Sequence, residues 1–120
     1  MKKIMLVDDS STIRNIIKNA LTAAYDVCEA EDGKKALDVL AGAGTVSLFL
    51  LDVNMPEMDG LTLLGEIRKL PAHKTTPVLM LTTETKEEFR SRARELGATG
   101  WVVKPCPPEK LLDTIKTLLS

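Results

Sequence analysis

The sequence is short of cysteine, of long hydrophobic runs and of charge of one sign, and each shortage excludes a class of protein. Its two cysteines, Cys28 and Cys106, form neither a Cys-x-x-Cys pair nor a metal-ligand spacing, so we expect reduced thiols. The formal net charge of -1 gives no basic field that would bind nucleic acid or an anionic membrane. No apolar run could cross a bilayer, and residues 4–7 are too few for the core of a signal peptide. We therefore expect a cytoplasmic protein.

The glycine motifs that bind nucleotide phosphates are also absent. The sequence contains neither a P-loop nor a Gly-x-Gly-x-x-Gly fingerprint. Its one histidine, His73, lies between a predicted helix and a predicted strand, where we expect a solvated loop residue. Any phosphoryl group used by this protein must then arrive on another molecule.

Short apolar runs alternate with segments in which apolar residues recur at helical spacing. The predicted strands cover residues 4–7, 25–30, 46–51, 77–81 and 101–103. A helix is expected after each strand. The first helix has an apolar face that includes Ile13, Ile16 and Ile17, and Gly97 is expected to cap the fourth. Five strands alternating with five helices predict an α/β fold, in which helices cover both faces of a doubly wound parallel sheet. We expect one domain over residues 1–120, with no output domain.

Polar side chains follow four of the five predicted strands. Asp8 and Asp9 follow the first strand, Asp52 the third, Thr82 the fourth and Lys104 the fifth. Each alone could be an ordinary polar loop residue, but the carboxyl ends of parallel strands meet at one edge of the sheet. Carboxylates gathered there would repel one another unless a cation sits among them, and Mg²⁺ is a cation that takes carboxylate and phosphate oxygens. The pattern predicts a site where a carboxylate takes up a phosphoryl group.

These residues and their neighbours resemble the receiver domain of two-component response regulators. The resemblance is carried by residues 7–10, 51–60, 81–83 and 102–105, and it covers essentially the whole chain. It implies the flavodoxin/CheY-like fold, with five helices and the strand order 2-1-3-4-5.

The resemblance also implies a role for each polar residue at the sheet edge. Asp52 matches the phosphoacceptor. Asp9, Asp52 and the backbone carbonyl of Asn54 match the Mg²⁺ ligands, and Asp8 matches the acidic residue of the metal site that orients a metal-bound water. Thr82 matches the hydroxyl that hydrogen-bonds the phosphoryl group.

Further matches, and one departure from the family pattern at Cys106, concern the end of the last strand. Lys104 matches the ammonium that pairs with phosphoryl oxygens, and the bond from Lys104 to Pro105 is expected to be cis. Trp101 occupies the aromatic switch position that works with Thr82, although Tyr or Phe is usual there. Cys106 stands where Phe is usual.

The function implied is that of a stand-alone, CheY-like response regulator in chemotaxis. It is not an enzyme, although as a phosphoacceptor it assists its own aspartyl phosphorylation and dephosphorylation. Its expected partners are a histidine kinase, a phosphatase and an output protein such as the flagellar motor switch, and we expect a monomer. Asn54 and Glu84 resemble the CheY type at two positions that tune hydrolysis of the aspartyl phosphate.

Other functions remain to be weighed. A phosphorelay shuttle would pass the phosphate to a second histidine protein that docks on the first helix, where Arg14 and Lys18 are expected on an exposed polar face. A phosphatase of the haloacid-dehalogenase type needs a second Asp two residues after the nucleophile, and Asn54 cannot act as that acid. A flavin-binding module is disfavoured because no hydroxyl-rich phosphate loop follows the first strand.

Overall fold

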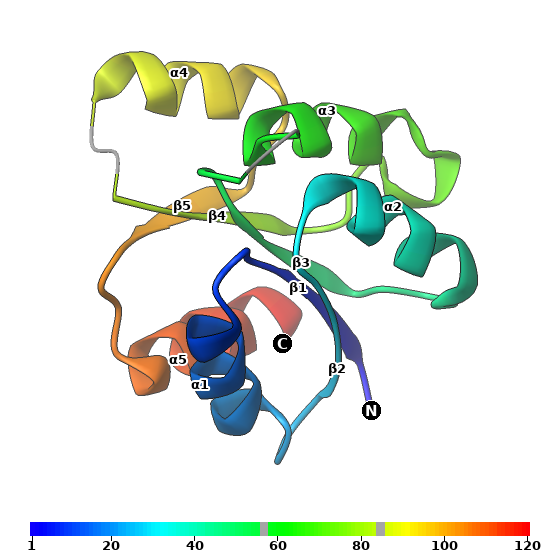
Figure 1. Ribbon diagram of the computed structural model, residues 1–120, viewed down its shortest axis with the longest axis vertical. Helices are drawn as coiled ribbons and strands as arrows, with labels where there is room; N and C mark the ends of the chain where they lie inside the picture. The colour runs from blue at the N-terminus through cyan, green and yellow to red at the C-terminus, as the bar shows by residue number, and fades with distance from the viewer. Residues whose placement is uncertain (56–57, 84–85) are drawn as a thin grey trace.

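Strands and helices alternate along the chain in the computed structural model, which describes residues 1–55, 58–83 and 86–120 (Figure 1). The strands are all parallel and form one sheet of order β2-β1-β3-β4-β5, which confirms the predicted topology. Their bounds are β1 Lys3–Val7, β2 Asp26–Ala30, β3 Leu48–Asp52, β4 Val78–Thr82 and β5 Gly100–Val103.

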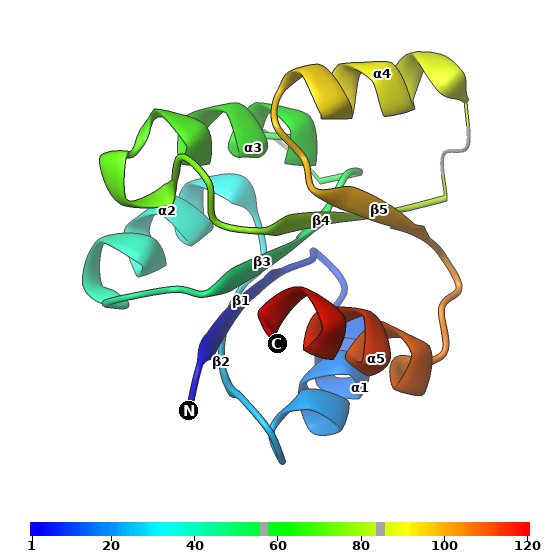
Figure 2. The ribbon, with the colours of Figure 1, turned by 180° about the vertical axis from the view of Figure 1, so that it is seen from behind.

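Helices cover both faces of this sheet. Their bounds are α1 Ser11–Leu21, α2 Gly33–Gly42, α3 Gly60–Lys69, α4 Glu87–Glu95 and α5 Pro108–Leu119, with a short 3₁₀ helix, η1, over Pro71–His73. Figures 1 and 2 show α1 and α5 on one face and α2, α3 and α4 on the other. Within the described residues, the helices are too short or too polar to span a membrane.

The sheet has a separate apolar core on each face because successive residues of a strand point to opposite sides. Leu6 and Leu50 pack with the residues of α1 and α5, whereas Met5 and Leu51 pack with those of α2, α3 and α4. All four side chains are fully buried. The strands β1, β3 and β4 are buried up to their carboxyl ends, which fixes the positions of those ends and so of Asp8, Asp52 and Thr82.

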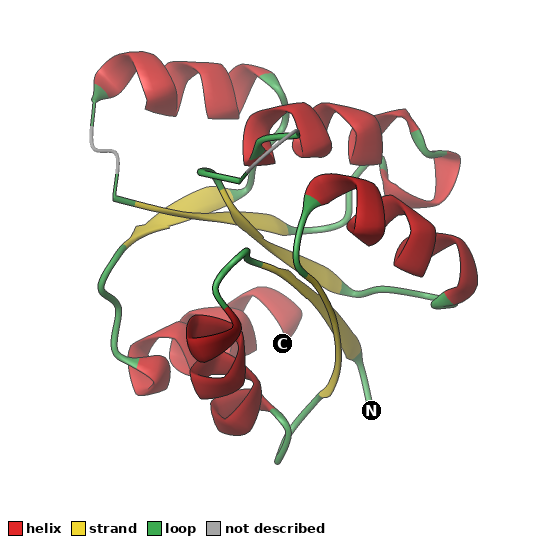
Figure 3. Cartoon of the chain, in the orientation of Figure 1, coloured by secondary structure: helices red, strands yellow, loops and turns green. Residues whose placement is uncertain are grey.

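Polar side chains cap the first three helices, as the sequence indicates. Ser10 accepts a hydrogen bond from the Ile13 amide, Asp32 from that of Lys35, and Asp59 from that of Thr62. Loops join the helices to the strands (Figure 3). Gly97 follows α4 with a φ of 95°, the left-handed conformation that favours glycine, which confirms its predicted capping position.

The expected burial of His73 and of Ile16 is wrong. His73 is not solvated: it is only 6% exposed, lies edge-on to Phe49, and has its Nδ1 2.9 Å from the hydroxyl of Thr76. Ile16 was expected on the apolar face of α1, yet it is 52% exposed. The buried stripe of α1 instead runs through Ile17 and Leu21, because only a narrow face of this helix meets the sheet.

Candidate functional site

Strand register brings the predicted polar residues together at the carboxyl edge of the sheet. Val7 pairs with Leu51, so Asp8 lies beside Asp52 at the ends of two neighbouring strands. On the next strands, the Lys104 amide donates to the carbonyl of Thr82 over 2.8 Å. The predicted convergence of the four strand ends is therefore present.

Three of these residues form an acidic group. Asp8, Asp9 and Asp52 each present a carboxylate oxygen, and all three oxygens lie within 4.8 Å of one another. Asp8 is fully buried and Asp52 is 3% exposed, whereas Asp9 is exposed. The group thus has a buried floor and an open side through which a small ion or an anionic group could enter.

Lys104 bridges the two buried carboxylates. Its Nζ lies 3.1 Å from Oδ2 of Asp8 and 3.0 Å from Oδ1 of Asp52. Burial raises the pKa of Asp52, the hydrogen bond from Lys104 opposes that rise, and the charge on Asp8 adds to it. Burial alone would lower the pKa of Lys104, but its bonds to Asp52 and Asp8 raise it overall. The lysine therefore stays charged, and it holds both carboxylates in place.

The donor set fits a hard divalent cation. Three carboxylates face one ammonium, so the group keeps an excess of negative charge after Lys104 is counted. Carboxylate oxygens are the ligands of Mg²⁺ and Ca²⁺, and an acidic group that is open on one side leaves room for water or phosphate oxygens. The arrangement could hold such an ion beside Asp52.

The absence of a side chain at Gly60 allows α3 to begin directly against the end of β3. A Cβ at Gly60 would lie 2.3 Å from the carbonyl oxygen of Asp52 and 2.9 Å from Cα of Val53. The Gly60 amide donates to the Val53 carbonyl over 3.0 Å, and the Asn54 amide approaches Oδ1 of Asp52 at 3.4 Å. This loop fixes the direction of Asp52. The sequence showed a loop here but not the contact that requires glycine.

Arg14 supports Asp8 from α1, although the sequence pattern placed it on an exposed polar face. That expectation is wrong, since the Arg14 side chain is only 15% exposed. Its Nε lies 3.1 Å from Oε1 of Glu29 on β2, and its Nη1 donates to the backbone carbonyl of Asp8 over 2.6 Å. Glu29 turns the guanidinium toward the sheet, and this contact between distant segments had no signal in the sequence of α1.

The residues named for the switch lie on the strands beyond Asp52. Thr82 ends β4 and is fully buried. Trp101 is half-buried on β5, and its ring centroid lies 4.9 Å from the guanidinium carbon of Arg90 and 5.8 Å from that of Arg94, both on α4. The bond from Lys104 to the following proline is cis, as predicted.

Glu84, which was named for a role in hydrolysis, lies outside the described residues.

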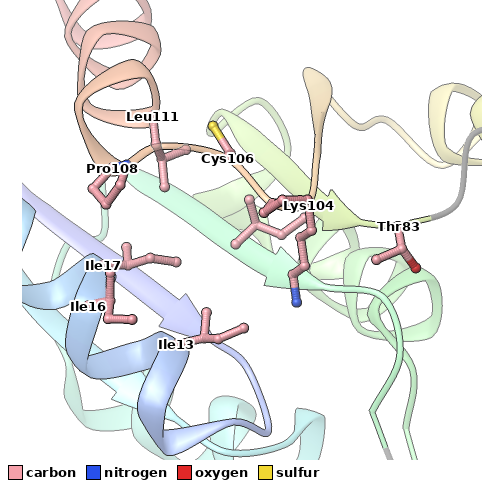
Figure 4. Close-up of a pocket in the computed structure, with 10 residues that line it drawn as sticks. Ile13, Ile16, Ile17, Thr83, Lys104, Cys106, Pro108 and Leu111 are labelled. Carbon is pink, nitrogen blue, oxygen red and sulfur yellow. The ribbon is translucent and has the colours of Figure 1, made fainter.

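An apolar cavity of about 410 Å³ lies next to the site, between α1 and the loop that follows β5. Figure 4 shows Lys104 at one side of this cavity and Cys106, a free thiol, near another. Ile16, which is exposed on α1, also lines it. Lys104 thus has the acidic group on one side and the apolar cavity on the other.

Comparison with known proteins identifies the family. The fold and site define a doubly wound α/β domain with an acidic group at the carboxyl edge of its sheet. The model of the family described as "Response regulator receiver domain" matches residues 4–116, and the chain belongs to this family.

The chain is similar to several chemotaxis proteins. It is 40% identical to the "Chemotaxis protein CheY homolog" of Campylobacter jejuni, over 98% of this chain and 92% of that protein. It is 38% identical to "Chemotaxis protein CheY1" of Helicobacter pylori, over 98% and 97% of the two chains. The solved structure of chemotaxis protein CheY4 of Vibrio cholerae superimposes with a TM-score of 0.93 at 42% identity, over 98% of both chains.

Proposed function

We propose that this chain is a stand-alone, CheY-like response regulator that takes a phosphoryl group onto Asp52 with the help of Mg²⁺. One observation carries the proposal: Lys104 bridges Asp8 and Asp52, while the oxygen of a third carboxylate, Asp9, lies within 4.8 Å and leaves the group with an excess of negative charge. A structural ion pair needs no third carboxylate. A site that receives a cation needs more negative charge than its lysine balances, and the third carboxylate supplies that charge.

Asp8, Asp9, Asp52 and the backbone carbonyl of Asn54 would hold the ion. When bound, Mg²⁺ supplies positive charge that offsets the charges of the carboxylates and of the incoming phosphoryl oxygens. Asp8 is the ligand that the chain fixes best: its Oδ1 accepts the Ser10 amide at 2.9 Å, and its Oδ2 accepts Lys104.

Phosphoryl transfer would convert the Asp52 carboxylate into an acyl phosphate. A carboxylate oxygen of Asp52 forms the new bond to phosphorus, the phosphorus–nitrogen bond of a phosphohistidine breaks, and its electron pair stays on the imidazole nitrogen. Lys104 would turn its ammonium from the carboxylates to the phosphoryl oxygens, and the Thr82 hydroxyl would hydrogen-bond the same group. Trp101 would then change its packing against α4, which alters the surface offered to an output protein.

The names of the relatives support chemotaxis as the process. The chain matches two CheY proteins over 92% and 97% of their lengths, which supports a CheY-like role, and we expect a monomer. A histidine kinase would donate the phosphoryl group in the cytoplasm, a phosphatase would assist its removal, and a flagellar motor switch protein would receive the signal. A phosphorelay shuttle is the alternative. Phosphorylated protein that passes its label to a histidine phosphotransfer protein and does not bind a motor switch protein would favour it.

The test is incubation with MgCl₂ and acetyl phosphate, followed by intact-protein mass spectrometry. We expect the mass of one phosphoryl group on the wild type, none after EDTA treatment, and none on Asp52→Asn. Asp38→Asn is the matched control, because Asp38 is exposed on α2 and should be labelled like the wild type. Labelling of Asp52→Asn, or an unlabelled wild type, would overturn the proposal.

A further inference from the structure

Asp9 is the acidic residue of the site that is held least directly. It is exposed, and in the described part of the chain no hydrogen bond or ion pair reaches its carboxylate. Asp8, by contrast, is fixed through its side chain and through its amide, which donates to the Ala30 carbonyl at 3.2 Å. The direction of Asp9 is therefore set through the backbone, which includes the peptide that joins it to Asp8.

Arg14 holds the carbonyl of that peptide. Its Nη1 donates to the Asp8 oxygen over 2.6 Å, while its Nε is fixed by Oε1 of Glu29 at 3.1 Å. A peptide group is planar, so fixing this oxygen also fixes the direction of the Asp9 amide, and with it the start of the Asp9 side chain. Glu29 is itself fixed, because it belongs to β2, where it pairs with Leu6 of β1.

The guanidinium of Arg14 is paired with a carboxylate that lies outside the acidic group. Glu29 accepts from Arg14 through Oε1 and from Lys18 through Oε2 at 3.0 Å, so one carboxylate faces two cations of α1. The guanidinium aims its free donor at a neutral carbonyl and not at any carboxylate of the acidic group. Its geometry suits orientation of the backbone, since the planar fork of Arg can hold two acceptors at once.

We propose that Arg14 is a positioning residue of the metal site, which acts by clamping the Asp8–Asp9 peptide so that Asp9 points at the ion. The inference rests on the proposed function, because it assumes that Mg²⁺ binds among Asp8, Asp9 and Asp52. Partners that orient metal ligands typically change the metal affinity by 10- to 100-fold when they are removed.

The sign of the effect separates positioning from simple electrostatics. Removing a cation that lies near an acidic group should strengthen the binding of Mg²⁺ if charge alone matters. Removing a clamp should weaken it. Arg14→Lys isolates the geometry, because it keeps the charge but has a single ammonium in place of the fork. Lys18→Gln is the matched control: Lys18 binds the same Glu29 from the same helix, but the Asp8 carbonyl is bonded by Arg14.

The experiment is isothermal titration of each protein with MgCl₂ alone, with the melting temperature in EDTA as a check on folding. We expect the Mg²⁺ dissociation constant to rise roughly tenfold in Arg14→Gln and in Arg14→Lys. In Lys18→Gln it should stay within about twofold of wild type or fall slightly, as loss of one surface cation predicts. A weaker Mg²⁺ affinity in a variant that melts like Lys18→Gln in EDTA cannot come from general instability.

Three results would overturn the inference. Wild-type affinity in Arg14→Lys would show that charge is sufficient, tighter binding in Arg14→Gln would show an electrostatic role, and an equal loss in Lys18→Gln would assign the effect to Glu29 alone. A wild type that binds no Mg²⁺ is a different outcome, since it removes the proposed function and the inference with it. If Arg14→Gln does not fold, the comparison of Arg14→Lys with Lys18→Gln decides the question.

Discussion

The two edges of the sheet each hold a half-buried cation, but the partners of these cations differ. At the carboxyl edge, Lys104 bonds the carboxylates of Asp8 and Asp52. At the amino ends of β4 and β5, Arg68 from the last turn of α3 donates to backbone carbonyls. Its partners are the carbonyls of His73 at 2.8 Å, Thr76 at 2.6 Å and Gly97 at 2.7 Å.

The difference separates a structural cluster from a functional one. Every acceptor of Arg68 is a neutral carbonyl of a loop that leads into a strand, so the cluster ties the chain together and needs no further ion. The carboxyl edge has three carboxylates for one lysine, an excess of negative charge that could hold a cation. Both clusters are polar and partly buried, so charge balance distinguishes them better than burial does.

The largest effect on stability should come from breaking the amino-edge cluster. Arg68→Ala leaves three loop carbonyls without their donor and should lower the free energy of unfolding by about 3 kcal/mol, measured by urea denaturation. Its increment of stability on adding MgCl₂ should equal that of the wild type. The control is Lys69→Ala, which removes an exposed pair with Glu66 and should cost less than about 0.5 kcal/mol. A lost Mg²⁺ increment in Arg68→Ala would erase the distinction between the edges.

A smaller effect should come from crowding the carboxyl edge. Gly60→Ala forces a Cβ against the carbonyl of Asp52, so we expect a loss of about 2 kcal/mol and a weaker Mg²⁺ affinity, because the strand end must move. Gly42→Ala is the matched control, since a Cβ at this helical glycine meets no atom within 4 Å. That change should be neutral or stabilise by about 0.5 kcal/mol. Equal Mg²⁺ affinity in Gly60→Ala and wild type would show that Asp52 does not depend on this contact.

The two edges should also respond to pH with opposite signs. Burial and the Asp8 charge raise the pKa of Asp52. Without Mg²⁺, the Asp52 carboxylate therefore takes up a proton at a higher pH in the folded protein than in the unfolded chain. Stability from this group therefore increases as the pH falls from neutrality through the raised pKa toward the usual range of Asp, and changes no further below it. Subtracting the unfolding free energy of Asp52→Asn from that of the wild type at each pH measures this term. A difference that falls with decreasing pH would contradict it.

The pH dependence of stability that comes from His73 should have the opposite sign. Burial and the nearby charge of Arg68 lower its pKa, so the unfolded chain takes up the proton first. The stability from this group is complete above about pH 6.5, the ordinary pKa of histidine, and is lost as the pH falls toward the lowered pKa. The difference between wild type and His73→Gln should therefore decrease over that interval. A flat difference would mean that the ring is protonated equally in both states.

The smallest signal should come from Trp101, the only tryptophan, which lies between the edges on β5 and pairs with Met80. Its emission should change when acetyl phosphate and MgCl₂ are added to the wild type, because the proposed rearrangement at Thr82 would alter the packing of the ring against Arg90 and Arg94. Asp52→Asn should show no change with the phosphodonor. An unchanged wild-type emission would argue that this ring is not coupled to the acidic group.

The residues that sequence reasoning located share one property: the backbone alone places them. Asp8, Asp52, Thr82 and Lys104 each stand at the end of a strand, and parallel strands bring such positions to one edge whatever the side chains around them are. The strand order itself came from resemblance, since apolar runs alone leave several topologies open.

What sequence reasoning misplaced or overlooked depends on contacts that the packed fold makes. Arg14 turns inward because Glu29 on β2 accepts its guanidinium, and His73 is buried because η1 folds over Phe49. Gly60 is required because of a carbonyl eight residues earlier, at Asp52. Helical periodicity and loop polarity contain no information about these contacts, which only the packed fold creates.

The central claim is that the excess negative charge at the carboxyl edge binds a divalent cation beside Asp52. The most direct test is the free energy of unfolding of the wild type and of Asp9→Asn, measured across a series of MgCl₂ concentrations. Above the dissociation constant, wild-type stability should rise by about 1.4 kcal/mol for each tenfold increase in Mg²⁺, and Asp9→Asn should begin to rise only at much higher concentration. Identical Mg²⁺ dependence in the two proteins would contradict the account.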